Sequence, residues 1–176
     1  MLDLGSGGGI DCFLAARQVG PTGHVTGLDM TTDMIKLAQQ NAESLGVSNV
    51  SFIQGEMEEI PLPDSSIDVV ISNCVVCLST DKDAVARESF RVLSQGGRLH
   101  ISDMMSLGEV PEILRSDPEK WASCITGAED RKSYLKRLEN AGFTNVSIDE
   151  EDGTARIYDP SAPAVVSVKV VAYKPN

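Results

Sequence analysis

The sequence predicts a three-layer α/β sandwich, in which helices cover both faces of a mostly parallel sheet with an antiparallel pair of strands at its C-terminal end. Three observations lead to this fold class. Short apolar segments of strand type alternate with segments whose apolar residues recur at helical spacing. No internal repeat, linker or low-complexity segment interrupts this order. The length of 176 residues suits one domain, so residues 1–176 are expected to fold as a single unit.

The first half of the chain is expected to contain four strands and two helices. Gly20-Pro21-Thr22-Gly23 ends the first helix, and Gly46 is suited to the C-terminus of the second. Thr31 or Thr32 can cap the start of that second helix. A proline-punctuated loop at residues 60–66 separates the third and fourth strands. The expected strands are residues 1–4, 24–28, 50–53 and 67–72, and the expected helices are residues 10–19 and 32–45.

The second half continues the alternation with two helices and three strands. A third helix is expected to begin at Asp81 and to end at Gly96-Gly97. Residues 103–130 are expected to be irregular with short helical pieces, as an insertion near the substrate. A fourth helix at residues 131–141 ends at Gly142. The expected buried positions of the third helix are Ala86, Phe90 and Leu93. The expected strands are residues 98–102, 146–148 and 165–173, and an acidic, turn-rich stretch separates the last two.

Charge and hydropathy exclude several classes of protein. Fifteen Lys and Arg residues oppose 26 Asp and Glu residues, which gives a formal net charge of -11. Because neutralisation of phosphates supplies most nucleic-acid affinity, no nucleic-acid partner is expected. No apolar run approaches the roughly 20 residues of a spanning helix, and no signal peptide opens the chain. We expect a cytoplasmic protein with reduced cysteines and no membrane partner, and the sequence leaves the oligomeric state open.

A glycine-rich loop between the first strand and the first helix indicates a ligand site. Gly5-x-Gly7-x-Gly9 lets the backbone turn tightly and approach a ligand closely. Asp29 ends the second strand, where its carboxylate can accept hydrogen bonds from both hydroxyls of a ribose. Gly55-Glu56-Met57 ends the third strand, where an adenine would lie. Because ligands of such sheets bind at the carboxyl ends of the strands, a nucleoside cofactor is expected; a nicotinamide-type fold with a degenerate loop is the alternative.

These segments resemble the class I S-adenosylmethionine-dependent methyltransferases, which have a Rossmann-like sheet. The resemblance rests on residues 2–9, 27–30, 67–70 and 91–97 and extends over essentially the whole chain. It implies S-adenosylmethionine as the cofactor, with Asp29 at the ribose and the glycine loop under the methionine moiety. The cofactor-binding residues that it implies are Asp3, Gly5, Ser6, Gly7, Gly9, Asp29, Met30, Gly55, Glu56, Met57 and Asn73.

Three cysteines distant in sequence are expected to meet at this edge of the sheet. Cys74 follows the fourth strand, Cys12 lies in the first turn of the first helix, and Cys124 lies in the 103–130 insertion. A helix N-terminus lowers the pKa of a thiol, which favours the thiolate of Cys12. Together the three thiols suggest a soft electrophile or metal as the substrate. For Cys12, simple packing in the core is an equally good interpretation.

A fourth cysteine leaves other interpretations open. Cys74-x-x-Cys77 could be a redox dithiol or half of a zinc site. Structural zinc is not expected, because there is no second Cys-x-x-Cys and neither His24 nor His100 has the spacing of a ligand.

At these residues the sequence resembles the arsenite methyltransferases. Ser72-Asn73-Cys74-Val75 and Cys124-Ile125-Thr126-Gly127-Ala128 carry the resemblance. It implies that Cys74 and Cys124 bind trivalent arsenic, and that Cys12 takes part in a disulfide relay served by a thiol reductant such as thioredoxin or glutathione. Cys77 stands where relatives usually have asparagine, and supplies a third soft ligand or has no role. The resemblance also implies an N-terminal lid and a longer C-terminal region, and we expect this chain to lack the lid and to have a short C-terminal region.

Three hypotheses about function follow. The first is methyl transfer from S-adenosylmethionine to thiolate-bound trivalent arsenic, which detoxifies arsenic. The second is a methyltransferase for a small organic acceptor such as a quinone, which requires a general base that Asn73 and Cys74 do not offer. The third is a truncated, non-catalytic domain that binds the cofactor or a metalloid.

Overall fold

The computed structural model describes residues 1–115, 118–122, 124, 126–150 and 163–176. The strands are β1 (Leu2–Leu4), β2 (Val25–Asp29), β3 (Val50–Gln54), β4 (Ile67–Asn73), β5 (Leu93–Ser106), β6 (Glu129–Asp130), β7 (Thr144–Glu150) and β8 (Val165–Tyr173). The helices are α1 (Ile10–Val19), α2 (Thr32–Leu45), the 3-10 helix η1 (Val76–Leu78), α3 (Lys82–Val92), α4 (Glu112–Arg115), α5 (Pro118–Ala122) and α6 (Arg131–Ala141). None of the helices in the described part of the chain is both long and apolar enough to span a bilayer.

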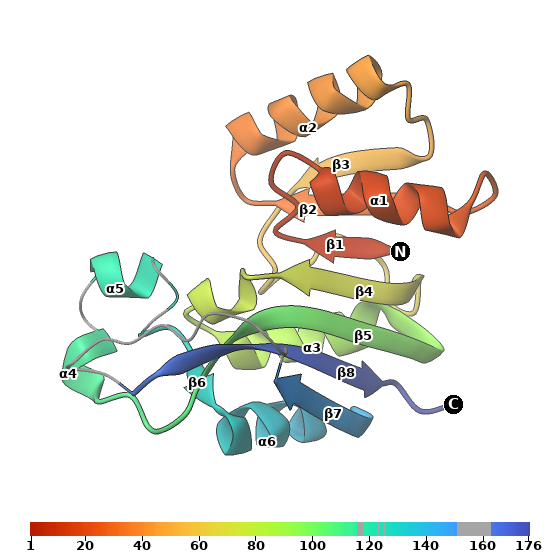
Figure 1. The fold of residues 1–176 in the computed structure, drawn as a ribbon. Helices are drawn as coiled ribbons and strands as arrows, with labels where there is room; N and C mark the ends of the chain where they lie inside the picture. Colours follow the sequence, from red (N-terminus) through yellow and green to blue (C-terminus); the bar gives the residue numbers. More distant parts are fainter. Residues whose placement is uncertain (116–117, 123, 125, 151–162) are drawn as a thin grey trace.

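The strands form one mixed sheet in the order β3-β2-β1-β4-β5-β8-β7, with β6 paired to β5 off this path. The pairs among β1 to β5 are parallel, and β8 is antiparallel to both β5 and β7. The predicted fold class is therefore confirmed, including the antiparallel C-terminal pair. Figure 1 shows α4 and α5 beyond the end of the sheet toward which the arrows of β1 and β4 point.

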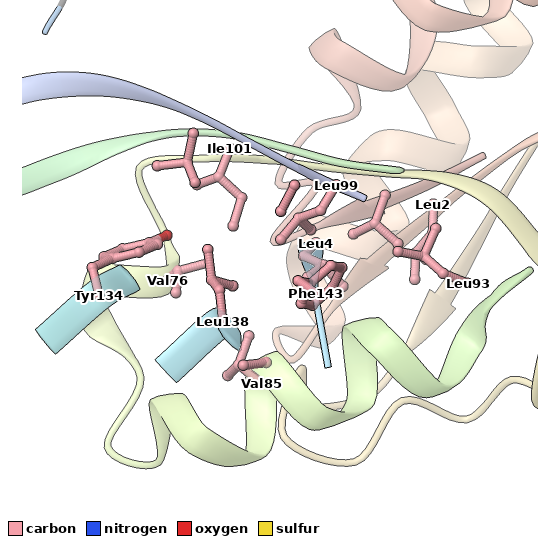
Figure 2. Packing of buried hydrophobic residues seen from close by; sticks show 14 of the residues in the cluster. Leu2, Leu4, Val76, Val85, Leu93, Leu99, Ile101, Tyr134, Leu138 and Phe143 are labelled. Atoms are coloured by element: carbon pink, nitrogen blue, oxygen red, sulfur yellow. The ribbon is translucent and has the colours of Figure 1, made fainter. Parts of the chain in front are cut away.

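Two apolar clusters hold the helices against the sheet. The smaller cluster joins α1 and α2 to β2 and β3, with Cys12, Ala38 and Phe52 among its members. The larger cluster joins α3 and α6 to β1, β5 and β8, and Figure 2 shows Leu4, Leu138 and neighbouring side chains inside it. Because alternate residues of a strand point to opposite faces, a buried sheet of this kind needs helices on both sides. The three layers follow from that requirement.

The helix ends agree largely with the sequence analysis. Gly46 caps α2 with φ 65°, the left-handed conformation expected there. The side chain of Asp81 caps α3 by accepting a hydrogen bond of 2.9 Å from the backbone N–H of Ala84. Thr31 is the N-cap residue of α2, but its side chain makes no capping hydrogen bond. The capping role expected of a threonine hydroxyl at this helix is therefore not present.

The boundary between α3 and β5 was predicted wrongly. The helix ends at Val92, and Leu93 begins a strand that runs through Gly96-Gly97 to Ser106. Leu93 is buried, as expected, but it pairs with Ile67 of β4. Backbone pairing with β4 decided the boundary, because tertiary context overrides the local preference for helix. β5 continues to Ser106, so residues 103–106 form part of a strand and are not irregular as expected.

The strand β8 has the predicted bounds 165–173, whereas β7 extends the expected 146–148 segment at both ends. Antiparallel pairing of β7 with the part of β8 from Val168 to Tyr173 explains the extra length of β7. The acidic, turn-rich stretch expected between the two strands falls mostly in 151–162, outside the described residues.

Arg91 of α3 holds the loop that follows β3. Its guanidinium donates hydrogen bonds of 2.8 Å to the carbonyl oxygens of Ile60 and Leu62, and it pairs with the carboxylates of Glu88 and Asp64. The Arg91 guanidinium lowers the pKa of Glu88, and Glu88 in turn accepts the backbone N–H of Ile60 at 2.8 Å. One side chain therefore satisfies several loop groups at once and fixes the path that leads away from the end of β3.

A carboxyl group is buried at the centre of the sheet. Asp3 of β1 is only 2% exposed, and the thiol of Cys12 donates a hydrogen bond of 3.2 Å to its Oδ2 atom. Burial raises the pKa of Asp3 to about 7, and nearby Asp11 and Asp29 act in the same direction. The pKa of this carboxyl group is 3.8 in the unfolded chain and about 7 in the folded state. At pH values between these two, Asp3 therefore keeps a proton in the folded state that it has released in the unfolded chain.

We expect Asp3 to make folding less favourable as the pH rises. Because the folded state binds more protons than the unfolded state in this window, the free energy of unfolding falls by about 3 kcal/mol between pH 4 and 7. Asp3→Asn should remove this part of the slope, which can be measured by urea unfolding at several pH values. Asp68→Asn, a change at an exposed carboxylate of β4, is the control. An unchanged slope in Asp3→Asn would contradict the assignment.

Candidate functional site

The carboxyl ends of four neighbouring parallel strands meet at one edge of the sheet. Leu4, the last residue of β1, pairs with Leu28 of β2 and with Ser72 of β4, and Asp29 pairs with Gln54 of β3. The segments that follow these strands are the glycine loop, the start of α2, the turn after β3 and the cysteine-rich segment after β4. Parallel pairing alone brings them together, as expected for ligand sites in such sheets.

The glycine loop is held by backbone hydrogen bonds and is open on one side. The N–H groups of Gly5 and Ser6 donate to the carbonyl oxygen of Leu28 at 2.8 and 2.9 Å. Gly5 and Gly7 have φ values of 69° and 51°. A Cβ atom on Gly5 would overlap the side chain of Val75, whereas one on Gly7 would meet no atom within 4 Å. Gly5 is required for packing, and the space over Gly7 is free for a ligand.

Asp29 is oriented by the loops on either side of it. Its Oδ2 atom accepts the N–H of Gly7 at 2.9 Å, and its Oδ1 atom accepts the N–H of Thr31 at 2.8 Å. A carboxylate can accept about four hydrogen bonds, so both oxygens keep the capacity to accept one more. A pair of adjacent ligand hydroxyls would fit this capacity.

A hollow of about 360 Å³ opens beside Asp29, within the size range of small-molecule sites. Six of the residues predicted to bind the cofactor line it: Gly5, Asp29, Met30, Gly55, Glu56 and Met57. The residues Leu28, Glu58, Val75, Leu78, Ser79 and Thr80 complete the wall. The sequence analysis did not identify the residues from β4 to α3 in this wall, because nothing in their pattern shows that η1 folds back over the turn after β3.

The other predicted cofactor residues lie elsewhere around the glycine loop. Asp3 and Asn73 line a second hollow of about 390 Å³ together with Asp11, whose carboxylate accepts a hydrogen bond of 3.2 Å from the Asn73 amide. Ser6 is buried, and Gly9 is the N-cap residue of α1. Six residues of the predicted set thus line the first hollow and two line the second, whereas Ser6, Gly7 and Gly9 line neither hollow.

Three of the four cysteines gather where β4 ends. Cys74 is exposed, Cys77 is 2% exposed in η1, and Cys124 is half-buried after α5. The Sγ atom of Cys124 lies 4.0 Å from the carbonyl oxygen of Cys74. The thiol of Cys77 is hydrogen-bonded to Cys124, which lowers the pKa of Cys124 and raises that of Cys77. Cys124 is therefore the first of this pair to become a thiolate.

Cys12 does not share this environment. Its side chain is fully buried in the cluster under α1 and bonds to Asp3. Burial and the neighbouring Asp3 carboxylate raise the pKa of its thiol far above the usual range. The expectation of a rim position with a thiolate favoured by the helix N-terminus is wrong, because desolvation outweighs the helix dipole.

Several residues of the thiol region were missed by the sequence analysis. Asp103 of β5 is fully buried and accepts the backbone N–H of Cys77 at 2.9 Å, and burial raises its pKa. The indole N–H of Trp121 donates to the carbonyl oxygen of Leu78 at 2.9 Å, and Lys82 lies 4.8 Å from the centre of the Trp121 ring. The sequence does contain a signal for Asp103, because it follows Leu99 and Ile101 at the alternate positions of β5 that point into the core.

The thiols do not form a ready metal site. Within the described residues, no group of three or more His, Cys, Asp or Glu side chains is arranged to hold a metal ion. Cys74 and Cys124 both have positive φ values, 54° and 59°, which non-glycine residues rarely adopt. Such conformations often occur where a site orients its side chains.

Known proteins resemble this chain along nearly its whole length. An arsenite methyltransferase of Halobacterium salinarum is 42% identical over 181 residues, covering 99% of this chain and 46% of that protein. A ubiquinone/menaquinone biosynthesis C-methyltransferase of Vibrio parahaemolyticus is 30% identical, over 82% of this chain and 64% of that protein. The chain thus spans about half the length of the curated arsenite methyltransferase that it matches.

Solved structures and a family model agree with this likeness. CrArsM, an arsenic (III) S-adenosylmethionine methyltransferase from Chlamydomonas reinhardtii, superposes with a TM-score of 0.85 at 36% identity, over 99% of this chain and 63% of that chain. The family model described as a methyltransferase domain matches residues 1–151. The matched range contains the glycine loop, Asp29 and all four cysteines. The chain therefore belongs to the methyltransferase domain family.

Proposed function

We propose that this domain transfers a methyl group from S-adenosylmethionine to trivalent arsenic held by the thiolates of Cys74 and Cys124. The observation that carries the proposal is the gathering of thiols at the end of β4, where Val75 and Leu78 of the same segment line the hollow beside Asp29. The arsenite methyltransferase and the arsenic (III) methyltransferase similar to this chain support the same substrate. The biological role would be the detoxification of arsenic.

The donor set at the hollow fits S-adenosylmethionine. Asp29 has free acceptor capacity for ribose hydroxyls, Met30 and the Gly55–Met57 turn offer a surface for adenine, and the space over Gly7 admits the methionine moiety. When bound, the cofactor supplies an electrophilic methyl group on a sulfonium ion. The chain contributes position and exclusion of water, which are the main requirements of such a displacement.

The thiols would hold the acceptor without a general base. Trivalent arsenic prefers soft sulfur ligands and keeps a lone pair, which two thiolates can direct at the methyl group. The hydrogen bond from the Cys77 thiol favours the thiolate of Cys124, the first ligand to form. We also propose that turnover uses a thiol reductant such as thioredoxin or glutathione, with Cys12 in a disulfide relay. Because Cys12 is fully buried, that relay would require α1 to move.

A small organic acceptor such as a quinone is the second candidate. The likeness to the ubiquinone/menaquinone biosynthesis C-methyltransferase favours it. An organic carbon or hydroxyl acceptor needs a base at the end of β4, and there the Asn73 amide already donates to Asp11. The arsenic proposal accounts for the cysteines, whereas the organic one does not.

We expect Asp29→Ala to weaken the binding of S-adenosylmethionine. The loss of charged hydrogen bonds worth about 1.5–3 kcal/mol corresponds to roughly 10- to 150-fold in affinity. Isothermal titration calorimetry measures this change, and a thermal melt checks that the variant still folds without the hydrogen bonds from Gly7 and Thr31 to the carboxylate. Asp33→Ala, at an exposed carboxylate of the same α2 region, is the matched control. Equal affinity in both variants would reject the ribose assignment.

We expect Cys74→Ser and Cys124→Ser each to abolish tight binding of phenylarsine oxide, a trivalent arsenical that forms two As–S bonds. Loss of one thiol removes the chelate effect, on the order of 100-fold or more. The double variant should bind little more weakly than either single variant, because the two thiols act as one unit. Titration followed by tryptophan fluorescence of Trp121 gives the affinities.

Cys12→Ser serves as the control for that experiment, since its thiol lies in the core beside Asp3. It should keep the affinity for phenylarsine oxide. Tight binding that survives in both Cys74→Ser and Cys124→Ser would exclude the two-thiol site and favour the organic acceptor.

A further inference from the structure

The cysteine cluster contains one thiol that the proposed two-thiol site does not use. Cys77 lies on η1, three residues after Cys74, and its side chain is almost completely buried. Of the thiols in the cluster, it is Cys77 that is hydrogen-bonded to Cys124. A buried cysteine often only packs, but this one contacts the sulfur of a proposed ligand and so carries more than a packing role.

The backbone around Cys77 holds its position firmly. Its N–H donates 2.9 Å to the buried carboxyl of Asp103. A Cβ atom on Gly127 would lie 2.4 Å from the Cys77 carbonyl oxygen, so the segment carrying Cys124 approaches η1 as closely as a glycine allows. The Trp121 indole ties α5 to the carbonyl oxygen of Leu78 on the same turn. Tertiary contacts from β5, α5 and the following segment thus hold η1 against the segment that carries Cys124.

The third cysteine, Cys74, borders the same site through its backbone. Cys124 Sγ is 4.0 Å from the Cys74 carbonyl oxygen, and Cys74 is exposed. Since no three-ligand geometry exists among the described residues before binding, at least one side chain must rotate. Rotation between staggered χ1 positions is an ordinary motion for an exposed cysteine.

We propose that Cys77 is a third sulfur ligand, so that inorganic arsenite is bound as a tris-thiolate of Cys74, Cys77 and Cys124. This inference rests on the arsenic function proposed above and names the form of the substrate. Three As–S bonds form and three As–O bonds break, and each departing hydroxide takes a thiol proton and leaves as water. The oxidation state of arsenic does not change, so no oxidant or reductant is needed.

The same arrangement distinguishes arsenite from organic arsenicals. An arsenical that already carries one carbon can form only two As–S bonds, and its substituent cannot enter the buried side of the site where Cys77 lies. Such a ligand would use the accessible Cys74 and Cys124. Cys77 would therefore add affinity for arsenite alone and make the site selective for the unmethylated substrate.

The test compares two ligands in one variant. Cys77→Ser should bind arsenite on the order of 10- to 100-fold more weakly, because one arm of the chelate is lost, and should lose much less affinity for phenylarsine oxide, because both of its proposed ligands, Cys74 and Cys124, remain. Cys77→Ala is the second variant, since it removes the sulfur without burying a hydroxyl group. Thermal melting identifies a variant that fails to fold, and binding of phenylarsine oxide shows that the remaining two-thiol site is intact.

Arsenic X-ray absorption of the arsenite complex gives an independent count of sulfur neighbours. Three sulfur neighbours in the unchanged protein and two in Cys77→Ala would support the proposal. Two sulfur neighbours in the unchanged protein, or equal arsenite affinity in Cys77→Ala, would overturn it and leave the two-thiol function standing. If a folded Cys77→Ala lost affinity for arsenite and for phenylarsine oxide to the same extent, the proposal would also be overturned. Cys77 would then be one of the two thiols that bind both ligands. If the arsenic function itself were wrong, Cys74→Ser and Cys124→Ser would instead both keep tight binding of phenylarsine oxide.

Discussion

The parallel pairing of β1 with β2 on one side and β4 on the other is the constraint on which the rest of the structure depends. It places the glycine loop, Asp29 and the start of the cysteine segment at the same edge of the sheet. Asp29 then joins two of these segments, because its oxygens accept N–H groups from Gly7 and Thr31. A ligand that binds the carboxylate consequently meets a loop whose shape is already determined, which lowers the entropy lost on binding.

The thiol region depends on a different set of contacts. It is assembled from the end of β4, η1 and the insertion after β5, and Figure 1 shows α5 of that insertion beyond the carboxyl ends of the strands. Trp121 and Gly127 join the insertion to η1 by one hydrogen bond and one close backbone contact. The proposed function places the cofactor in a hollow on the sheet and the acceptor on an insertion, an arrangement in which the substrate can change while the fold stays the same.

Buried ionisable groups surround both parts of the site. Asp3 lies under the glycine loop and Asp103 lies behind Cys77, and burial raises the pKa of each. Groups of this kind make folding less favourable, and they are found most often where a site needs them. Here each carboxyl bonds to a cysteine, so the environment of two of the thiols is determined by the sheet that carries them.

The sequence by itself determined the fold class, the order of the elements and the edge of the sheet at which most of the candidate cofactor residues gather, because periodicity, glycine positions and strand ends are local signals. Six of the predicted cofactor residues line one hollow for that reason. Local signals misplaced the end of α3, since pairing of Leu93 with β4 decides it, and they suggested a thiolate at Cys12, whose burial only packing could reveal. Only the tertiary structure brought Cys77 against Cys124 and buried Asp103 behind it, because these residues come from elements whose mutual position depends on long-range contacts.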